Sequence, residues 1–224
     1  VLSGSDLVIQ DTLGDRTPGA AIPLTRDATA DLTGGAFRGN TTGSGLTATG
    51  GGAVYAEGAS LVRLDGTVIE DNDAGFGGAI ALAGTSRAEL TGVTLRGNTA
   101  TGVGGGLSLA GATRAVCTQC TVDDNASADG GGVHMTGSAS LTVVDGEWSN
   151  NVSGADGGAI RAVQGTALEL SGVSFLNNRA SGAGGALSAA TIDAPIGITD
   201  CLFDGNEAAA SDGGAIFAGR DTTV

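Results

Sequence analysis

The sequence is organised by the stretch from Gly77-Gly78-Ala79-Ile80 to Asn98. It contains two short sequence motifs, here called words, and Asn98 in the second lies eighteen residues after Ile80 in the first. The first word consists of two glycines, a small residue and an aliphatic residue, and it recurs at steps of 26, 27, 26, 27, 27 and 29 residues. Its small residue is Ala53, Ala79, Gly106, Gly132, Ala159, Ala186 and Ala215. A fixed period of this length indicates a solenoid, because a propeller blade needs about 40–45 residues.

The second word is a bulky apolar residue placed three positions before an asparagine, and it keeps the same period. The asparagines follow one another at steps of 32, 26, 27, 26, 27 and 28 residues: Asn40, Asn72, Asn98, Asn125, Asn151, Asn178 and Asn206. We expect them to stack as a structural ladder, because amides bonded to the neighbouring coil satisfy polar groups that the coil would otherwise bury unpaired.

Apolar residues within one repeat alternate in short bursts, which is the pattern of strands with one buried face. The pairs Ile80 and Leu82, Ala88 and Leu90, and Val93 and Leu95 predict three strands per coil. Stacked coils would pair equivalent strands in parallel, about 4.8 Å apart. The sequence therefore predicts an all-β fold, a right-handed parallel β-helix with about 26–27 residues and three short strands per coil.

The unbroken period predicts a single β-helix domain over residues 1–224. We expect a partial coil and a loop over 1–18, a degenerate coil with a long loop over 19–50, six regular coils over 51–206 and the start of a further coil over 207–224. Because neither end shows a polar cap, we also expect the chain to be a piece of a longer protein.

Composition excludes several classes of function. The 42 glycines and the 3% aromatic content suit a narrow solenoid interior. A net charge of −14 argues against binding to nucleic acid and to anionic membranes, because both need a basic surface. No run of 18 apolar residues occurs, so the segment is not expected to insert into a membrane.

The outward positions beside the asparagine words carry the only candidate catalytic cluster, Glu70, Arg96 and Asp123. Successive coils would make these side chains neighbours, which predicts an exposed salt-bridge ladder. A second interpretation is a polysaccharide-cleaving site, because carboxylates two coils apart lie about 10 Å from each other, close to the spacing in inverting glycosidases. We favour the ladder, and predict no catalytic residue.

Three further features of the sequence are candidate sites. Cys117 and Cys120 are expected to point inward around one corner, either as a disulfide or as buried free thiols. His134 is expected on an exposed strip beside Arg161, without partners for catalysis or metal binding. The segments Asp71-Asn72-Asp73 and Asp123-Asp124-Asn125 could bind Ca²⁺ but lack a calcium-loop pattern, so no cofactor is predicted.

The two words resemble the repeats of the chlamydial-type polymorphic outer-membrane protein family. The first word is matched by GGAV at 51–54, GGAI at 77–80, 157–160 and 213–216, and GGAL at 184–187. The second is matched by FRGN at 37–40, FLNN at 175–178 and FDGN at 203–206. The resemblance implies a right-handed β-helix and a secreted, surface-exposed passenger domain that acts in adhesion.

We therefore predict a non-enzymatic rod outside the cell, at the bacterial surface. Its expected partners are a protein or glycan on a cell surface, or other copies or segments of the chain itself. The alternatives are a polysaccharide-active lyase or glycosidase centred on Glu70, Arg96 and Asp123, and a subunit of a homomeric surface filament.

Overall fold

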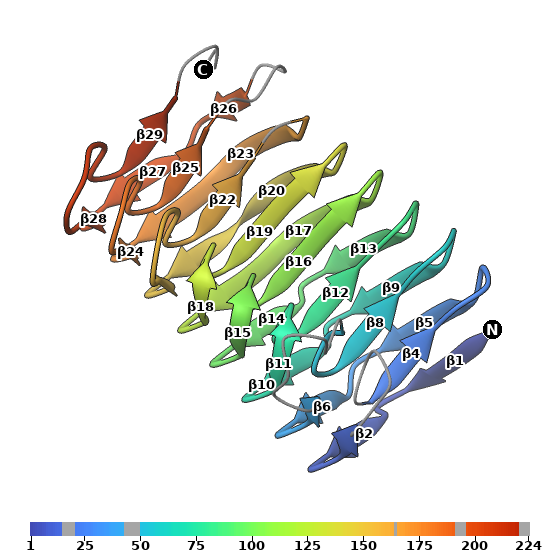
Figure 1. The fold of residues 1–224 in the computed structure, drawn as a ribbon. Coiled ribbons are helices and arrows are strands. Elements are labelled where there is room, and N and C mark those ends of the chain that lie inside the picture. The colour runs from blue at the N-terminus through green and yellow to red at the C-terminus, as the bar shows by residue number, and fades with distance from the viewer. Residues whose placement is uncertain (15–20, 43–49, 164, 191–195, 220–224) are drawn as a thin grey trace.

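The computed structural model describes residues 1–14, 21–42, 50–163, 165–190 and 196–219, and in these residues the chain forms 29 strands. Figure 1 shows the strands stacked coil upon coil along one axis, from the N-terminus at one end to the C-terminus at the other. Each strand pairs in parallel with its equivalent one coil away, for example Ile80–Leu82 with Leu107–Gly111. No helix in the described residues is long and apolar enough to cross a membrane.

The strands form three parallel sheets, called A, B and C. Sheet C has eight strands, and from β8 onward each of them follows a Gly-Gly word. These are β4 (Ile22–Leu24), β8 (Val54–Ala56), β12 (Ile80–Leu82), β16 (Leu107–Gly111), β19 (Val133–Gly137), β22 (Ile160–Ala162), β25 (Leu187–Ala189) and β29 (Ile216–Ala218). Its register aligns the repeated aliphatic residues, so that Ile80 lies between Val54 and Leu107.

Sheet A combines the second and third strands expected from the sequence. Its members are β1 (Leu2–Ser5), β2 (Val8–Gln10), β5 (Thr29–Thr33), β6 (Ala36–Arg38), β9 (Leu61–Asp65), β10 (Val68–Glu70), β13 (Arg87–Thr91), β14 (Thr94–Arg96), β17 (Arg114–Asp123), β20 (Ser140–Ser149), β23 (Ala167–Leu176), β26 (Ile196–Thr199) and β27 (Leu202–Asp204). In β17, β20 and β23 the two expected strands are continuous, so both lie on one face of the rod.

Sheet B is the layer that the apolar pattern did not reveal, because it follows the asparagine and contains small polar residues. Its strands are β3 (Leu13–Gly14), β7 (Thr41–Thr42), β11 (Asp73–Phe76), β15 (Thr99–Val103), β18 (Ala126–Asp129), β21 (Val152–Ser153), β24 (Arg179–Ala180) and β28 (Glu207–Ala208). The solenoid therefore has three parallel sheets, as expected, but they divide the coil differently.

The core is a continuous column of apolar side chains inside the three sheets. Leucine, isoleucine, valine and alanine fill most of it, and Trp148 and Phe175 are its largest members toward the C-terminal end. Trp148 contacts Phe175 edge-on at 5.8 Å between ring centroids, and Phe175 stacks on Phe203 at 4.8 Å. Like side chains stack because the parallel register places equivalent positions next to one another.

The second position of the sheet C strand is buried in β8, β12, β16, β19 and β25, which corrects the exposed strip expected for His134. Tyr55 and His134 are each 8% exposed, and Ser188 is fully buried. The preceding Gly-Gly turn covers this position: a methyl group on Gly130 would lie 3.0 Å from the Cβ atoms of His134 and Arg161. The two-residue alternation failed here because a turn lies over the outer face of the strand.

Several expected loops fall partly outside the described residues. The loop expected at residues 41–50 begins with β7, and its residues 43–49 are not described. The same holds for residues 15–20, 164, 191–195 and 220–224.

Candidate functional site

The outer face of sheet A carries charged side chains in two columns that follow the stack. One column lies on β5, β9 and β13, and the other on β6, β10 and β14 of the same three coils. In coil order the pairs are Asp31 and Arg38, Arg63 and Glu70, and Glu89 and Arg96, and we call these six residues the charged face. Charge alternates along each column and between the two columns within each coil.

Glu70 is the centre of the second column. Its Oε1 pairs with Nε of Arg38, and its Oε2 pairs with Nη2 of Arg96. The Glu70 side chain is only 13% exposed, whereas the two arginines are more than half exposed. The predicted neighbours Glu70 and Arg96 thus form an ion pair, with Arg38 as a partner that the sequence reading did not include.

Asp123 does not complete the expected salt-bridge ladder. It is aligned with Arg96 in the sheet register, but its Oδ1 accepts hydrogen bonds from Ser149 Oγ at 2.8 Å and Asn150 Nδ2 at 2.9 Å. Glu70 raises the pKa of Arg96, and Asp71 and Asp123 add to that rise. Asp123 therefore contributes at longer range, while its carboxylate bonds to the following coil.

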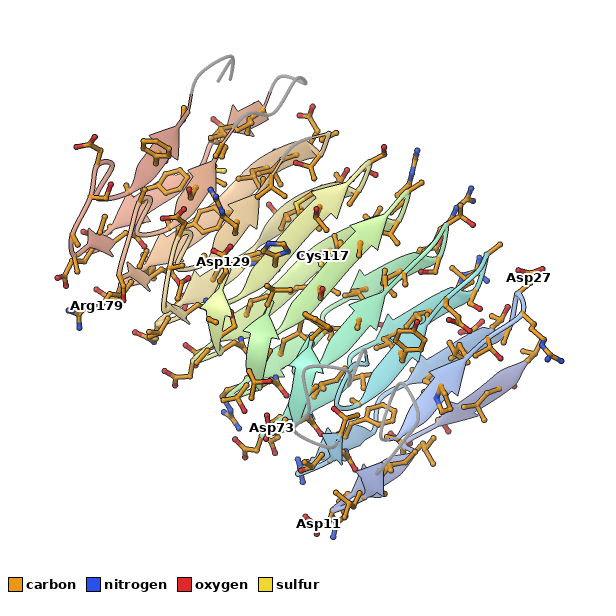
Figure 2. The ribbon with its side chains drawn as sticks, viewed as in Figure 1. Asp11, Asp27, Asp73, Cys117, Asp129 and Arg179 are labelled. Carbon is orange, nitrogen blue, oxygen red and sulfur yellow. The ribbon has the colours of Figure 1, made fainter. Side chains whose placement is uncertain are left out.

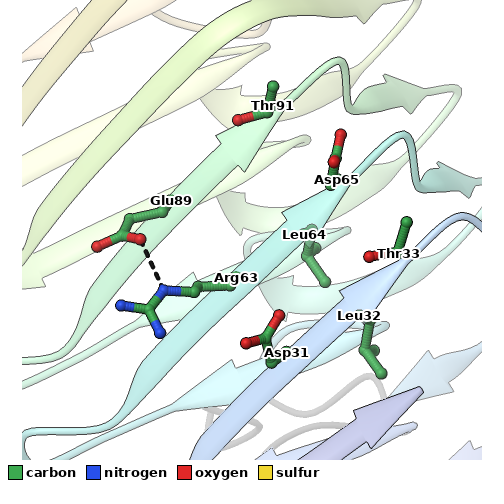
Figure 3. A pocket seen from close by; sticks show the side chains of 8 residues that line it. All are labelled: Asp31, Leu32, Thr33, Arg63, Leu64, Asp65, Glu89 and Thr91. Atoms are coloured by element: carbon green, nitrogen blue, oxygen red, sulfur yellow. Dashed lines mark hydrogen bonds and ion pairs between the residues drawn. The ribbon is translucent and has the colours of Figure 1, made fainter. Parts of the chain in front are cut away.

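A shallow groove of about 210 Å³ lies over the first column of the charged face, on β5, β9 and β13. Figure 3 shows Arg63 and Glu89 joined across neighbouring strands, with Nε of Arg63 2.8 Å from Oε2 of Glu89. The polar side chains that line the groove are Asp31, Thr33, Arg63, Asp65, Glu89 and Thr91. Sequence reasoning missed this groove because it examined only the outward residues beside the asparagines.

The seven asparagines lie in one internal stack. The Nδ2 of Asn98 donates to Oδ1 of Asn125 at 3.0 Å, and the Nδ2 of Asn72 donates to Oδ1 of Asn98 at 2.9 Å. The backbone N–H of each asparagine before Asn206 also donates to Oδ1 of the next, for example Asn98 to Asn125 at 3.0 Å. The second Nδ2 hydrogen of Asn98 reaches the carbonyl of Ile69 at 3.0 Å, so the amide is fully bonded.

The cysteines are free thiols in the structure, so the disulfide weighed for Cys117 and Cys120 is not formed. Both lie on β17 of sheet A with their side chains buried in the core, and Figure 2 labels Cys117. A hydrogen bond to Cys120 and burial raise the pKa of Cys117. Its thiol is therefore held in the protonated form, and it packs as a small apolar side chain.

A polar cluster surrounds His134 where the turn after β18 covers β19 and β22. Asp129, labelled in Figure 2, places Oδ2 3.7 Å from Nε2 of His134 and Oδ1 3.7 Å from Nε of Arg161. Arg161 also reaches Asp156 at 3.2 Å and Ser188 at 2.8 Å. The cluster ties three successive coils together on the outside of sheet C.

The His134 cluster makes stability depend on pH. Burial lowers the pKa of His134, an effect that Asp129 opposes and Arg161 reinforces. The unfolded chain then binds a proton at a higher pH than the folded chain, so stability falls as pH drops below the unfolded pKa of about 6.5.

We expect H134N, which removes the sole histidine, to lose less stability than the parent chain when the pH is lowered from about 7.5 to about 5.5. Denaturant unfolding of both proteins at both pH values measures this, and equal losses would contradict it.

Comparison with known protein families agrees with this geometry. The model of the right-handed β-helix region matches residues 19–179, well over half of the chain. The chain belongs to the right-handed β-helix family. The model of the Chlamydia polymorphic membrane protein repeat also matches, at residues 172–190 and 200–219. No curated protein and no solved structure matches the chain.

The two repeat matches in this β-helix coincide with the words read from the sequence. The first contains Phe175, Asn178 and the turn before β25, and the second contains Phe203 and Asn206. In both, the aromatic residue lies in the core stack and the asparagine lies in the ladder. The family pattern therefore describes the residues that hold one coil on the next.

Proposed function

We propose that this β-helix is a non-enzymatic rod displayed at a bacterial surface, where it acts in adhesion without a cofactor. The polymorphic membrane protein repeats support a surface role, because that family consists of surface proteins. The solenoid supports a rod, because stacked coils build an extended body with long lateral faces. The partner is a protein or glycan on a cell surface.

The observation that carries the proposal is the charged face with its groove. Its side chains stand at the regular spacing of the coils and point away from the core. The carboxylate of Asp65 and the hydroxyl of Thr91 have no hydrogen-bond partner in the part of the chain that the structure describes. Such groups can bond to sugar hydroxyls or to polar side chains of a partner without breaking an existing contact.

The arrangement around Glu70 favours a binding role over the polysaccharide-cleaving alternative. Both of its carboxylate oxygens already pair with guanidinium groups, those of Arg38 and Arg96. Asp123 is bonded to Ser149 and Asn150. A glycosidase instead needs one carboxyl free to donate a proton and another free to activate water or attack the sugar.

A binding and cleavage experiment tests the proposal. Purified chain is applied to cultured cells and to arrayed glycans, and the same preparation is incubated with polysaccharides while reducing ends are measured. We expect saturable binding without new reducing ends, and about tenfold weaker binding for D65A/T91A, which removes two hydrogen-bonding groups from the groove.

The matched control is S171A/T199A, which removes two exposed hydroxyls from the same sheet outside the groove. It should bind as the parent does. Release of reducing ends that E70Q abolishes would establish the enzyme instead, and equal binding by both double variants would place the adhesive surface elsewhere.

A further inference from the structure

The charged face is complementary to itself. In each of its three coils one column carries an acid and the other a base, and the order reverses from coil to coil. A twofold axis parallel to the rod would bring each column of one copy against the opposite column of a second copy, coil for coil. The facing pairs would then be Asp31 with Arg38, Arg63 with Glu70, and Glu89 with Arg96, all of opposite charge.

The same face disfavours the antiparallel arrangement in which the coils are centred on one another. A twofold axis perpendicular to the rod through the middle coil would bring Arg63 against Arg63, Glu70 against Glu70 and Asp31 against Glu89 of the other copy, so every facing pair would repel. An antiparallel pair centred between two coils would instead bring Arg63 against Glu89 and Glu70 against Arg96, so the contact between Arg63 and Glu70 belongs to the parallel pair alone.

The turn between the two columns carries no large side chain at Gly66 and Gly92. Gly66 and Gly92 occupy this turn with φ of +61° and +57°, and a methyl group built on Gly66 would meet no atom within 4 Å. The side chains that flank it, among them Thr91 and Thr94, are small. In the following coil Gln119 replaces the glycine, and the first column ends because Val116 follows Glu89, whereas Asp123 continues the alternation of the second column.

We propose that two copies of this chain pair side by side, with their axes parallel, through the charged face of sheet A. The inference rests on the proposed role of this face as a binding surface. A second copy seated on the face covers the groove and therefore competes with a cell-surface partner for it. The expected contacts are the three opposite-charge pairs, each formed twice by the symmetry. Figure 1 shows β5, β9 and β13 in three successive coils toward the N-terminal end of the stack, so this side-by-side contact leaves the coils toward the C-terminus uncovered.

Engineered cysteines test the geometry of the pair. In a C201S background, which removes the one partly exposed native thiol, R63C and E70C are prepared separately and oxidised alone and as a mixture. Parallel pairing predicts a covalent dimer in the mixture that neither single variant forms efficiently. The matched control mixes T101C, an exposed position on sheet B, with E70C and measures random collision.

Charge reversal tests the cause of pairing. We expect sedimentation equilibrium of the parent chain to show a dimer that weakens with added salt, and R63E to raise its dissociation constant about tenfold or more. R179E is the matched control, because it reverses another arginine that is about half exposed and paired with a glutamate, Glu207, on sheet B. R179E should leave the dimer unchanged.

Three results would overturn the inference: a monomer at concentrations up to about 0.5 mM, efficient cross-linking of R63C alone, or a mixture that cross-links no more than the T101C control. Circular dichroism establishes that each variant is folded. A monomer that still binds cells would refute pairing and leave adhesion standing. A parallel dimer whose dissociated chains also bind no cell or glycan would support pairing and refute adhesion.

Discussion

Replacing Asn98 by alanine is expected to destabilise the rod by about 4 kcal/mol. The Asn98 side chain accepts from the backbone N–H of Asn72 at 3.1 Å and from its Nδ2, and it donates to Ile69 and Asn125. Alanine removes all four hydrogen bonds and leaves the buried N–H of Asn72 without this acceptor, whereas Oδ1 of Asn125 keeps the backbone N–H of Asn98. Chemical denaturation followed by circular dichroism measures the loss.

The control for Asn98 is T101A, which truncates an exposed side chain three residues further along the same coil. We expect T101A to change the unfolding free energy by less than about 0.5 kcal/mol, as surface substitutions usually do. A loss for N98A below about 1 kcal/mol would show that the ladder is not a main source of coil-to-coil stability.

Replacing Gly78 by alanine is expected to prevent folding or to cost more than about 4 kcal/mol, because overpacking against backbone cannot relax by a rotamer change. A methyl group at this position would lie 2.3 Å from the carbonyl oxygen of Gly105 and 2.5 Å from that of Thr99. Soluble yield and thermal unfolding of G78A measure the effect.

Gly66 provides the comparison for Gly78. Its φ of +61° disfavours a side chain, but nothing lies within 4 Å of the added methyl group. G66A should therefore cost only about 1 kcal/mol of backbone strain. Equal losses for the two variants would show that conformational freedom, rather than close approach of neighbouring coils, explains the glycines of the Gly-Gly word.

The sequence was sufficient to predict the β-helix because its stacking residues repeat. Equivalent residues such as Ile80 and Leu107 are one circuit of the coil apart, so two words with one period determined the solenoid and its repeat length. Sheet B escaped notice because residues such as Thr99 and Ala126 carry no apolar alternation. Its pairing follows from the stack, not from local preference.

Contacts between different parts of neighbouring coils could not be read from the sequence. The burial of His134 depends on how closely the turn at Gly130 approaches it, and no periodic pattern encodes that distance. Asp123 was expected to pair with Arg96, but its carboxylate accepts hydrogen bonds from Ser149 and Asn150 in the following coil. Which of several nearby polar groups a side chain bonds to depends on the geometry of the side chains, and the spacing of residues in the sequence does not give that geometry.

The charged face could be predicted from the sequence only in part. The alternating charges of Glu70, Arg96 and Asp123 were visible in the sequence as one column, and the ion pair between Glu70 and Arg96 follows from the coil spacing. The other column, with Arg63 and Glu89, becomes adjacent only because both expected strands share sheet A. The two columns form one surface because their strands belong to the same sheet.

Labelling of intact cells tests the central claim, display at a bacterial surface, most directly. Antibodies raised against the purified chain are applied to intact and to permeabilised cells of the bacterium that encodes it, with an antibody to a cytoplasmic protein as the control. We predict equal labelling of intact and permeabilised cells, together with loss of the signal after brief protease treatment of intact cells. Labelling that appears only after permeabilisation would contradict a surface rod.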